Sequence, residues 1–252
     1  MSELLVTTEN GVATLTLHRP EKRNALNDGL ISSLKTALRD ADRDEDVFAA
    51  VIRGAGNDFC SGADLSSLQK ISESSVLENL EDAESLRELF ILIRKVRVPV
   101  IAAVHGRALA GGCGLATACD LVLASRTATF GYPEVKIGFV PAMVMAILRR
   151  NVSEKRAFEL ITRGGDFTAD EADSFGLVNR VFDDQSFESD VQDYVAAFCK
   201  LSRSAVLLSK KLLYQMDSMT FETALQTGAE INSIARMTED CKKGIEKFLK
   251  RS

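Results

Sequence analysis

Two glycine-bearing stretches, Phe59-Cys60-Ser61-Gly62-Ala63-Asp64 and Ala110-Gly111-Gly112-Cys113-Gly114, mark the architecture of this 252-residue sequence. The first follows the short apolar run Val47–Ile52, and the second follows Val100–Val104. Each also precedes a stretch with helical spacing of its apolar residues. Buried strands that pass through glycine turns into helices are typical of the core of an α/β protein.

The rest of the chain continues this alternation. The strands Leu4–Thr8 and Val12–Leu17 are predicted to form a hairpin around Asn10-Gly11, a pair suited to a turn with positive φ. Further strands are predicted at Leu121–Ala124 and Val178–Phe182. Helices are predicted after the capping residue Asn27, over 80–96, over Val140–Arg149, after Ser153, and after a capping box formed by Thr168 and Glu171. The pattern is helical after about Ser186. We therefore expect a core over residues 1–190 and a helical region over residues 191–252.

Composition excludes several classes of protein. The formal net charge is −5, 46% of residues are hydrophobic, and no uncharged run approaches the roughly 20 residues that a membrane helix needs. A mildly acidic chain has no general reason to bind nucleic acid or anionic lipid. The five scattered cysteines and two distant histidines predict neither a disulfide framework nor a metal site. These features favour a cytoplasmic enzyme without membrane or nucleic-acid partners.

The two glycine turns have a chemical use if they lie together. Glycine lets the backbone approach a ligand closely, and a helix start leaves N–H groups without partners. Two such turns could direct a pair of backbone donors at one oxygen, forming an oxyanion hole. Either turn alone is more often a tight connection without a catalytic task.

A third segment, Phe130-Gly131-Tyr132-Pro133-Glu134-Val135, places a carboxylate between apolar neighbours. Partial desolvation would raise the pKa of Glu134 toward the range useful for proton transfer. The alternative is an ordinary acidic residue in a surface loop.

Together, these three segments and the run His18-Arg19-Pro20-Glu21-Lys22-Arg23-Asn24-Ala25-Leu26 resemble the crotonase, or enoyl-CoA hydratase/isomerase, superfamily. The resemblance covers the chain to about Phe182. It implies an α/β, crotonase-like spiral of ββα units with two stacked sheets and a C-terminal helical trimerisation region. It also implies a homotrimer or homohexamer that acts on acyl-CoA thioesters through an enolate.

The resemblance further implies the site residues. The oxyanion-hole donors would be the backbone N–H groups of Ser61 and Gly111, and Glu134 would be the catalytic acid/base. Residues implied to bind CoA and substrate are Lys22, Arg23, Ala25, Ser61, Gly62, Ala63 and Asp64. Coenzyme A is part of the substrate, so no separate cofactor and no metal are expected.

One position departs from the hydratase pattern. Hydratases of the superfamily hold a water between two glutamates, and this chain has Gly114 where the first would stand. Isomerases of the superfamily work with one carboxylate, which slightly favours double-bond isomerisation. The alternatives are an enoyl-CoA hydratase that uses Glu134 alone, for a straight-chain or branched substrate such as methylglutaconyl-CoA, an acyl-CoA thioesterase, or a non-catalytic acyl-CoA-binding subunit.

The stretch after Glu134 is unusually bulky and apolar. Phe139 and Met143 are candidates for lining an acyl pocket, since Met adapts to varied surfaces. The alternative for this stretch is plain helix core.

Overall fold

The computed structural model describes residues 2–250, except for the side chains of residues 65–68. Within these residues, the main sheet has six strands. The strand order is β1-β2-β3-β4-β6-β9, with β1 antiparallel to β2 and the remaining pairs parallel. The strands are β1 (Leu4–Glu9), β2 (Val12–Leu17), β3 (Ala49–Gly54), β4 (Val100–Val104), β6 (Leu121–Ser125) and β9 (Arg180–Phe182). Asn10 and Gly11 turn between β1 and β2 with φ of 52° and 80°, as the sequence predicts.

Both faces of the central strands are buried, which explains their continuous apolar runs. On β3, Ala50 and Ile52 belong to the large core, while Ala49 and Val51 face a smaller core closed by helix α8 (Phe187–Ala196). Strand β4 divides its side chains in the same way, with Ile101 and Ala103 toward α8.

A second sheet of three short strands lies beside the main one. It has the order β5-β7-β8 and consists of β5 (Arg107–Leu109), β7 (Thr129–Gly131) and β8 (Asp166–Thr168). An isolated bridge between Cys60 and Ala108 joins it to the loop that follows β3. Stacked rings of Phe130 and Phe167, 5.8 Å between centroids, fill its inner side. The sequence predicted none of these three strands individually.

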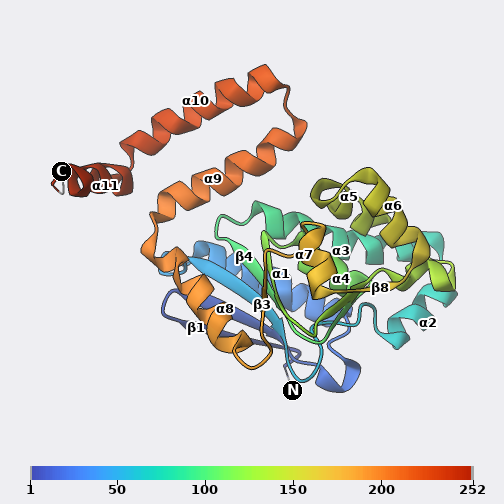
Figure 1. The fold of residues 1–252 in the computed structure, drawn as a ribbon. Helices are drawn as coiled ribbons and strands as arrows, with labels where there is room; N and C mark the ends of the chain where they lie inside the picture. The colour runs from blue at the N-terminus through green and yellow to red at the C-terminus, as the bar shows by residue number, and fades with distance from the viewer. Residues whose placement is uncertain (1, 251–252) are drawn as a thin grey trace.

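Eight helices within residues 2–196 surround the sheets (Figure 1). Several begin at side-chain caps: Asn27 accepts a hydrogen bond from the Leu30 N–H, and Thr168 and Glu171 form the predicted capping box. The helices are α1 (Asp28–Arg43), α2 (Leu65–Glu73), α3 (Val76–Lys95), α4 (Gly111–Ala118), α5 (Ala142–Asn151), α6 (Glu154–Arg163), α7 (Ala169–Ser174) and α8 (Phe187–Ala196). Short 3₁₀ helices are η1 (Pro20–Lys22), η2 (Pro133–Ile137), η3 (Phe198–Lys200) and η4 (Met216–Ser218).

The C-terminal helices α9 (Arg203–Gln215), α10 (Phe221–Met237) and α11 (Glu239–Leu249) run out from the body as an arm (Figure 1). Buried Lys210 anchors α9, donating to the carbonyls of Ile93 and Val98 and pairing with Asp120 at 2.6 Å. The expected division at residue 190 falls inside α8, which packs on the main sheet, so the arm begins only after α8. Among residues 2–250, none of the helices combines the length and the apolar character that a membrane span requires.

Candidate active site

The loop after β3 and the start of α4 are in direct contact. The Cys60 N–H donates to the Arg107 carbonyl, and the Leu109 N–H donates back to the Cys60 carbonyl, each at 3.0 Å. A Cβ atom on Gly112 would lie 2.2 Å from the Cys60 carbonyl oxygen. Glycine at position 112 therefore allows the two turns to touch, as the sequence prediction required.

Ser61 does not present its N–H to a ligand, contrary to the sequence prediction. That N–H donates to the Arg23 carbonyl at 3.0 Å. The loop runs beside residues 23–26 as a short parallel pairing, in which the Leu26 N–H donates to the Gly62 carbonyl and the Asp64 N–H to the Leu26 carbonyl. This pairing consumes the donor that Ser61 was expected to offer.

The next candidate donor along this loop is Ala63. In an extended segment, alternate N–H groups point to opposite sides, so the Ala63 N–H points away from Leu26. It makes no hydrogen bond within the described residues, and Ala63 is exposed. The preceding Gly62, with φ of 97°, is required here: a Cβ on it would lie 2.9 Å from the Ala110 Cβ and 3.4 Å from the Gly111 nitrogen.

Gly111 is the second candidate donor, at the start of α4. Its N–H belongs to the first helical turn, has no intrahelical acceptor and makes no hydrogen bond within the described residues. A Cβ on Gly111 would meet only Leu26 Cδ1, at 3.6 Å, so open space lies in front of this residue. The Ala63 and Gly111 donors thus come from touching turns, on either side of the contact that Gly62 makes with Ala110.

Glu134 lies in η2, where Pro133 begins the turn after the fully buried Tyr132. Its Oε2 atom is buried and has no hydrogen-bond partner among the described residues. Burial raises the pKa of Glu134 above its ordinary value. The Cys113 thiol of α4 is buried, which raises its pKa to about 12, and the charge of Glu134 adds to this shift. That thiol is therefore a poor nucleophile.

The space beside Gly114 is filled by apolar side chains. A Cβ on Gly114 would lie 2.8 Å from Val144 Cγ2 and 3.3 Å from Phe90 Cζ. Helices α5 and α3 therefore occupy the volume that a glutamate at position 114 would need. The sequence indicated the missing carboxylate but not these two residues, which lie 24 and 30 positions away from Gly114.

The other predicted site residues are divided between surface and interior. Lys22 and Arg23 are exposed, and Ala25 is buried. Asp64 is 3% exposed, and its carboxylate pairs with Arg19, so its side chain does not face a ligand. Phe139 is 40% exposed after η2, whereas Met143 is half-buried and packs against the large core.

The comparison with known proteins decides the family. The family model for enoyl-CoA hydratase/isomerase matches residues 7–252. The chain belongs to the enoyl-CoA hydratase/isomerase family. It is 39% identical over 98% of both chains to a Thermus thermophilus protein named provisionally as an enoyl-CoA hydratase. It is also 34% identical to the Escherichia coli 2,3-dehydroadipyl-CoA hydratase, over 100% of this chain and 97% of that one.

Solved structures of the family agree with the architecture. An enoyl-CoA hydratase of Mycobacterium smegmatis superposes with a TM-score of 0.95 at 32% identity, covering 99% of this chain and 96% of that one. The crotonase fold predicted from the sequence is confirmed, with two sheets and a helical C-terminal region. As a member of the enoyl-CoA hydratase/isomerase family, the protein is an enzyme that acts on acyl-CoA.

Proposed function

We propose that this enzyme moves a double bond within an enoyl-CoA thioester, with Glu134 as its single acid/base. The observation that carries the proposal is the contrast around Gly114: one buried carboxylate oxygen without a partner, and apolar Val144 and Phe90 where a second carboxylate would stand. Holding a water for addition benefits from two carboxylates, whereas shuttling a proton requires one. The reaction needs no further cofactor, since coenzyme A is part of the substrate.

The backbone donors would stabilise the charge that forms. Glu134 takes a proton from Cα of a 3-enoyl thioester, and the electron pair moves through the carbonyl to the thioester oxygen as a dienolate. The N–H groups of Ala63 and Gly111 donate to that oxygen, with Ala63 in place of Ser61. Glu134 then returns the proton to Cγ, giving the 2-enoyl thioester with no net gain or loss of atoms. The raised pKa of Glu134 suits both steps, because it reduces the difference between the pKa of this carboxyl group and that of the substrate C–H bond.

Incubation with 3-enoyl-CoA and 2-enoyl-CoA in deuterated water tests the proposal. Deuterium at Cα or Cγ without net water addition, seen by mass and NMR analysis, is the expected result. A 3-hydroxyacyl product would instead establish hydration, and free CoA would establish thioester hydrolysis. Binding without turnover of either substrate would establish a non-catalytic acyl-CoA-binding protein.

Hydration with Glu134 alone is the second candidate. It is favoured by the names of relatives, among them a short-chain-enoyl-CoA hydratase of Clostridium acetobutylicum at 31% identity over all of this chain. In that case Glu134 would activate the water and protonate Cα in turn, without a partner at position 114.

Restoring the second carboxylate is expected to change the product. Gly114→Glu alone would drive a side chain into Val144, so Val144→Ala is combined with it. In the double variant the ratio of hydrated to isomerised product is expected to rise by about 10²-fold, the lower end of what one positioned acid or base contributes. Val144→Ala alone, which opens the space without adding a carboxylate, is the matched control. An unchanged ratio in the folded double variant would mean that position 114 does not face the reacting carbons.

The nucleotide and pantetheine parts of CoA would lie along residues 22–26. Exposed Lys22 and Arg23 supply positive charge there for phosphates. The hydrogen bond from the Ser61 N–H to the Arg23 carbonyl connects this segment directly to the loop that carries Ala63. One end of the ligand would thus be held next to the donors for its thioester.

We also propose that the enzyme is a trimer or a hexamer assembled through its arm. No residue of α10 or α11 is buried in the single chain, and Phe221, Leu225 and Met237 on α10 are 74%, 60% and 70% exposed. Apolar surface of this kind is typical of subunit interfaces. Light scattering should give three or six times the 27.5 kDa chain mass, and the double variant Leu225→Glu/Met237→Glu should shift it toward 27.5 kDa. A wild-type monomer at micromolar concentration would contradict the proposal.

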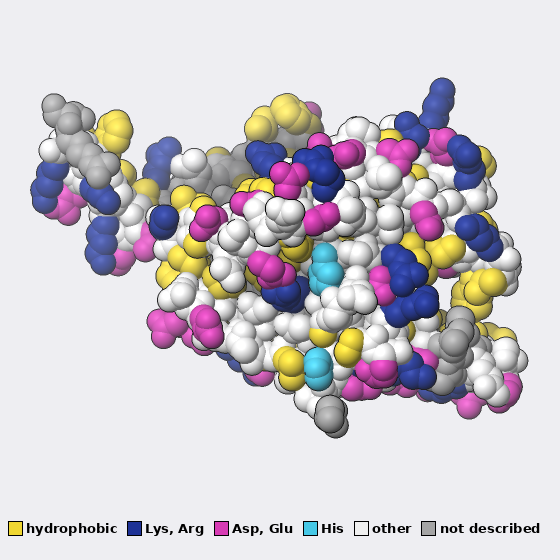
Figure 2. All heavy atoms as spheres, turned by 60° about the horizontal axis from the view of Figure 1, so that its bottom comes forward, with side chains coloured by type: hydrophobic (Ala, Val, Ile, Leu, Met, Phe, Trp, Pro, Cys, Tyr) yellow, Lys and Arg dark blue, Asp and Glu magenta, His cyan; other side chains and the backbone are white. Residues whose placement is uncertain are grey.

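The exposed charges elsewhere are mixed in sign. In Figure 2, Lys and Arg side chains are interspersed with Asp and Glu across the face shown. Arg126, for example, pairs with both Asp170 and Asp183. Attraction of the negatively charged acyl-CoA would therefore depend on nearby residues such as Lys22 and Arg23 rather than on a positive electrostatic potential over this whole face.

A further inference from the structure

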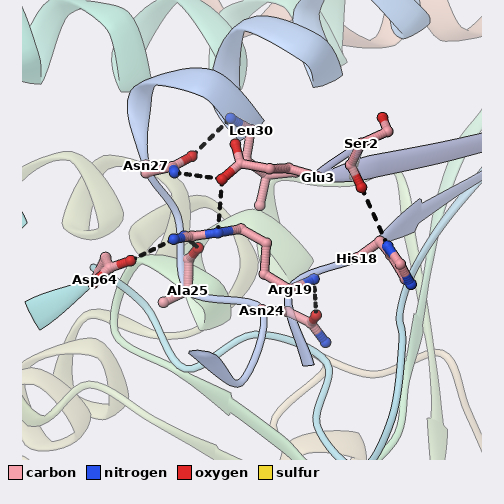
Figure 3. Close-up of polar contacts among 9 residues, drawn as sticks. All are labelled: Ser2, Glu3, His18, Arg19, Asn24, Ala25, Asn27, Leu30 and Asp64. Atoms are coloured by element: carbon pink, nitrogen blue, oxygen red, sulfur yellow. Dashed lines mark hydrogen bonds and ion pairs between the residues drawn. The ribbon is translucent and has the colours of Figure 1, made fainter. Parts of the chain in front are cut away.

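Arg19 is a buried arginine that the proposed chemistry does not use directly. Its side chain is 10% exposed, and its guanidinium has three partners in three different segments (Figure 3). Nη2 donates to Asp64 Oδ2 at 2.6 Å, Nη1 donates to the Ala25 carbonyl at 2.5 Å, and Nε lies 3.0 Å from Glu3 Oε1.

Two of these partners lie in segments of the proposed site. Asp64 directly follows Ala63, whose N–H is the proposed donor. Ala25 lies in the segment proposed to border CoA. Glu3 continues the network, because its Oε1 also accepts from the Asn27 side-chain amide, and Asn27 caps α1 (Figure 3).

The backbone of Arg19 also makes hydrogen bonds to the segment proposed to border CoA. Its N–H donates to Asn24 Oδ1 at 2.9 Å, and its carbonyl accepts from the N–H groups of Lys22 and Asn24. Arg23 and Asn24 adopt φ of 51° and 53°, a left-handed conformation that is costly for residues other than glycine. The contacts of Arg19 therefore hold a strained segment in place beside the hole.

We infer that Arg19 is a positioning residue that sets the direction of the Ala63 N–H and aligns it with the CoA-binding segment. This inference rests on the proposed function. A buried ion pair adds little net stability over apolar side chains of the same volume, so the pair is better explained by the geometry it imposes. The planar guanidinium holds its N–H groups in fixed directions toward three separate acceptors, which the ammonium group of lysine cannot reproduce.

The test compares Arg19→Lys, Arg19→Gln and Asp64→Asn with the control Arg53→Gln. Arg53 forms a bidentate pair with Glu188 on α8, and among the described residues its side chain makes no hydrogen bond or ion pair with residues 59–64 or 22–26. With 3-enoyl-CoA, Arg19→Lys and Arg19→Gln are expected to lower kcat by about 10²-fold, the cost of a roughly 1 Å misplacement of a catalytic group. KM should change much less than kcat, and Arg53→Gln should leave both near wild type.

The carbonyl stretching frequency of the bound thioester gives a second readout that a structural role alone would not move. Hydrogen bonds from the hole lower this frequency in the wild type, and the shift should be smaller in the folded Arg19→Lys variant. Thermal unfolding identifies any variant that fails to fold. If Arg19→Gln does not fold, Arg19→Lys and Asp64→Asn still test the inference. If the wild type binds and converts acyl-CoA while folded Arg19→Lys keeps full kcat and an unchanged carbonyl frequency, the inference is wrong. If the wild type itself shows neither binding nor turnover of any acyl-CoA, the proposed function fails instead.

Discussion

Glu134→Gln is expected to lower turnover of 3-enoyl-CoA by about 10²–10⁴-fold, the range that one positioned acid or base contributes. The amide keeps the shape of the side chain but cannot accept the proton from Cα. Affinity for the CoA thioester should hardly change, because the buried oxygen of Glu134 makes no hydrogen bond to residues 22–26, which would bind the nucleotide. Steady-state kinetics with binding calorimetry separate the two effects.

The pH dependence of turnover provides a further check on Glu134. The proposed base must be ionised to take the Cα proton, and burial raises its pKa above the ordinary value. Turnover by the wild type should therefore fall as the pH decreases through this raised pKa, and that acidic limb should be absent from the residual rate of Glu134→Gln. Lys136→Gln, an exposed change on the same 3₁₀ helix, is the matched control. Full activity in Glu134→Gln would require another base.

Local signals in the sequence predicted the elements that depend on local physics. Asn10-Gly11 predicted the hairpin, and Asn27 and Thr168 predicted helix starts, because each acts on residues within three positions of itself. Strand Val100–Val104 was predicted with its observed bounds. The strand predicted at Val47–Ile52 lies instead at Ala49–Gly54, since apolar content alone does not fix where the ladder begins and ends.

The second sheet could not be predicted from its own residues. Strands β5, β7 and β8 have three residues each, too few to show a period of two. Their pairing depends on contacts between segments more than 20 residues apart.

The same limit applies to the proposed site. The resemblance indicated this loop, but whether the Ser61 or the Ala63 N–H is left without a partner there depends on the pairing of the loop with residues 23–26. Likewise, Gly114 revealed a missing carboxylate. That Val144 and Phe90 fill the space of this carboxylate could be seen only from the packing of α5 and α3 against α4. Arg19 was part of the quoted motif, yet its contact with Asp64 is visible only when segments 45 residues apart are brought together.

The second large effect is expected from Gly111. Gly111→Val should lower turnover by at least about 10²–10³-fold, the loss that follows removal of one oxyanion-hole donor. Its side chain would extend into the open space beside Gly111, where the thioester is proposed to bind. The fold should survive, because a Cβ at this position meets only Leu26 Cδ1 at 3.6 Å.

Gly112→Ala is a control with the opposite expected effect, because it should destabilise the fold. A Cβ on Gly112 would lie 2.2 Å from the Cys60 carbonyl oxygen, so Gly112→Ala must push the two turns apart and should lower the melting temperature. Circular dichroism and thermal unfolding should therefore find Gly111→Val close to wild type and Gly112→Ala destabilised. Smaller losses in Gly111→Ala would fit the same steric cause, because a methyl group leaves part of the space open. Near-normal turnover in Gly111→Val would mean that the thioester binds elsewhere, because the added isopropyl group would occupy the space proposed for it.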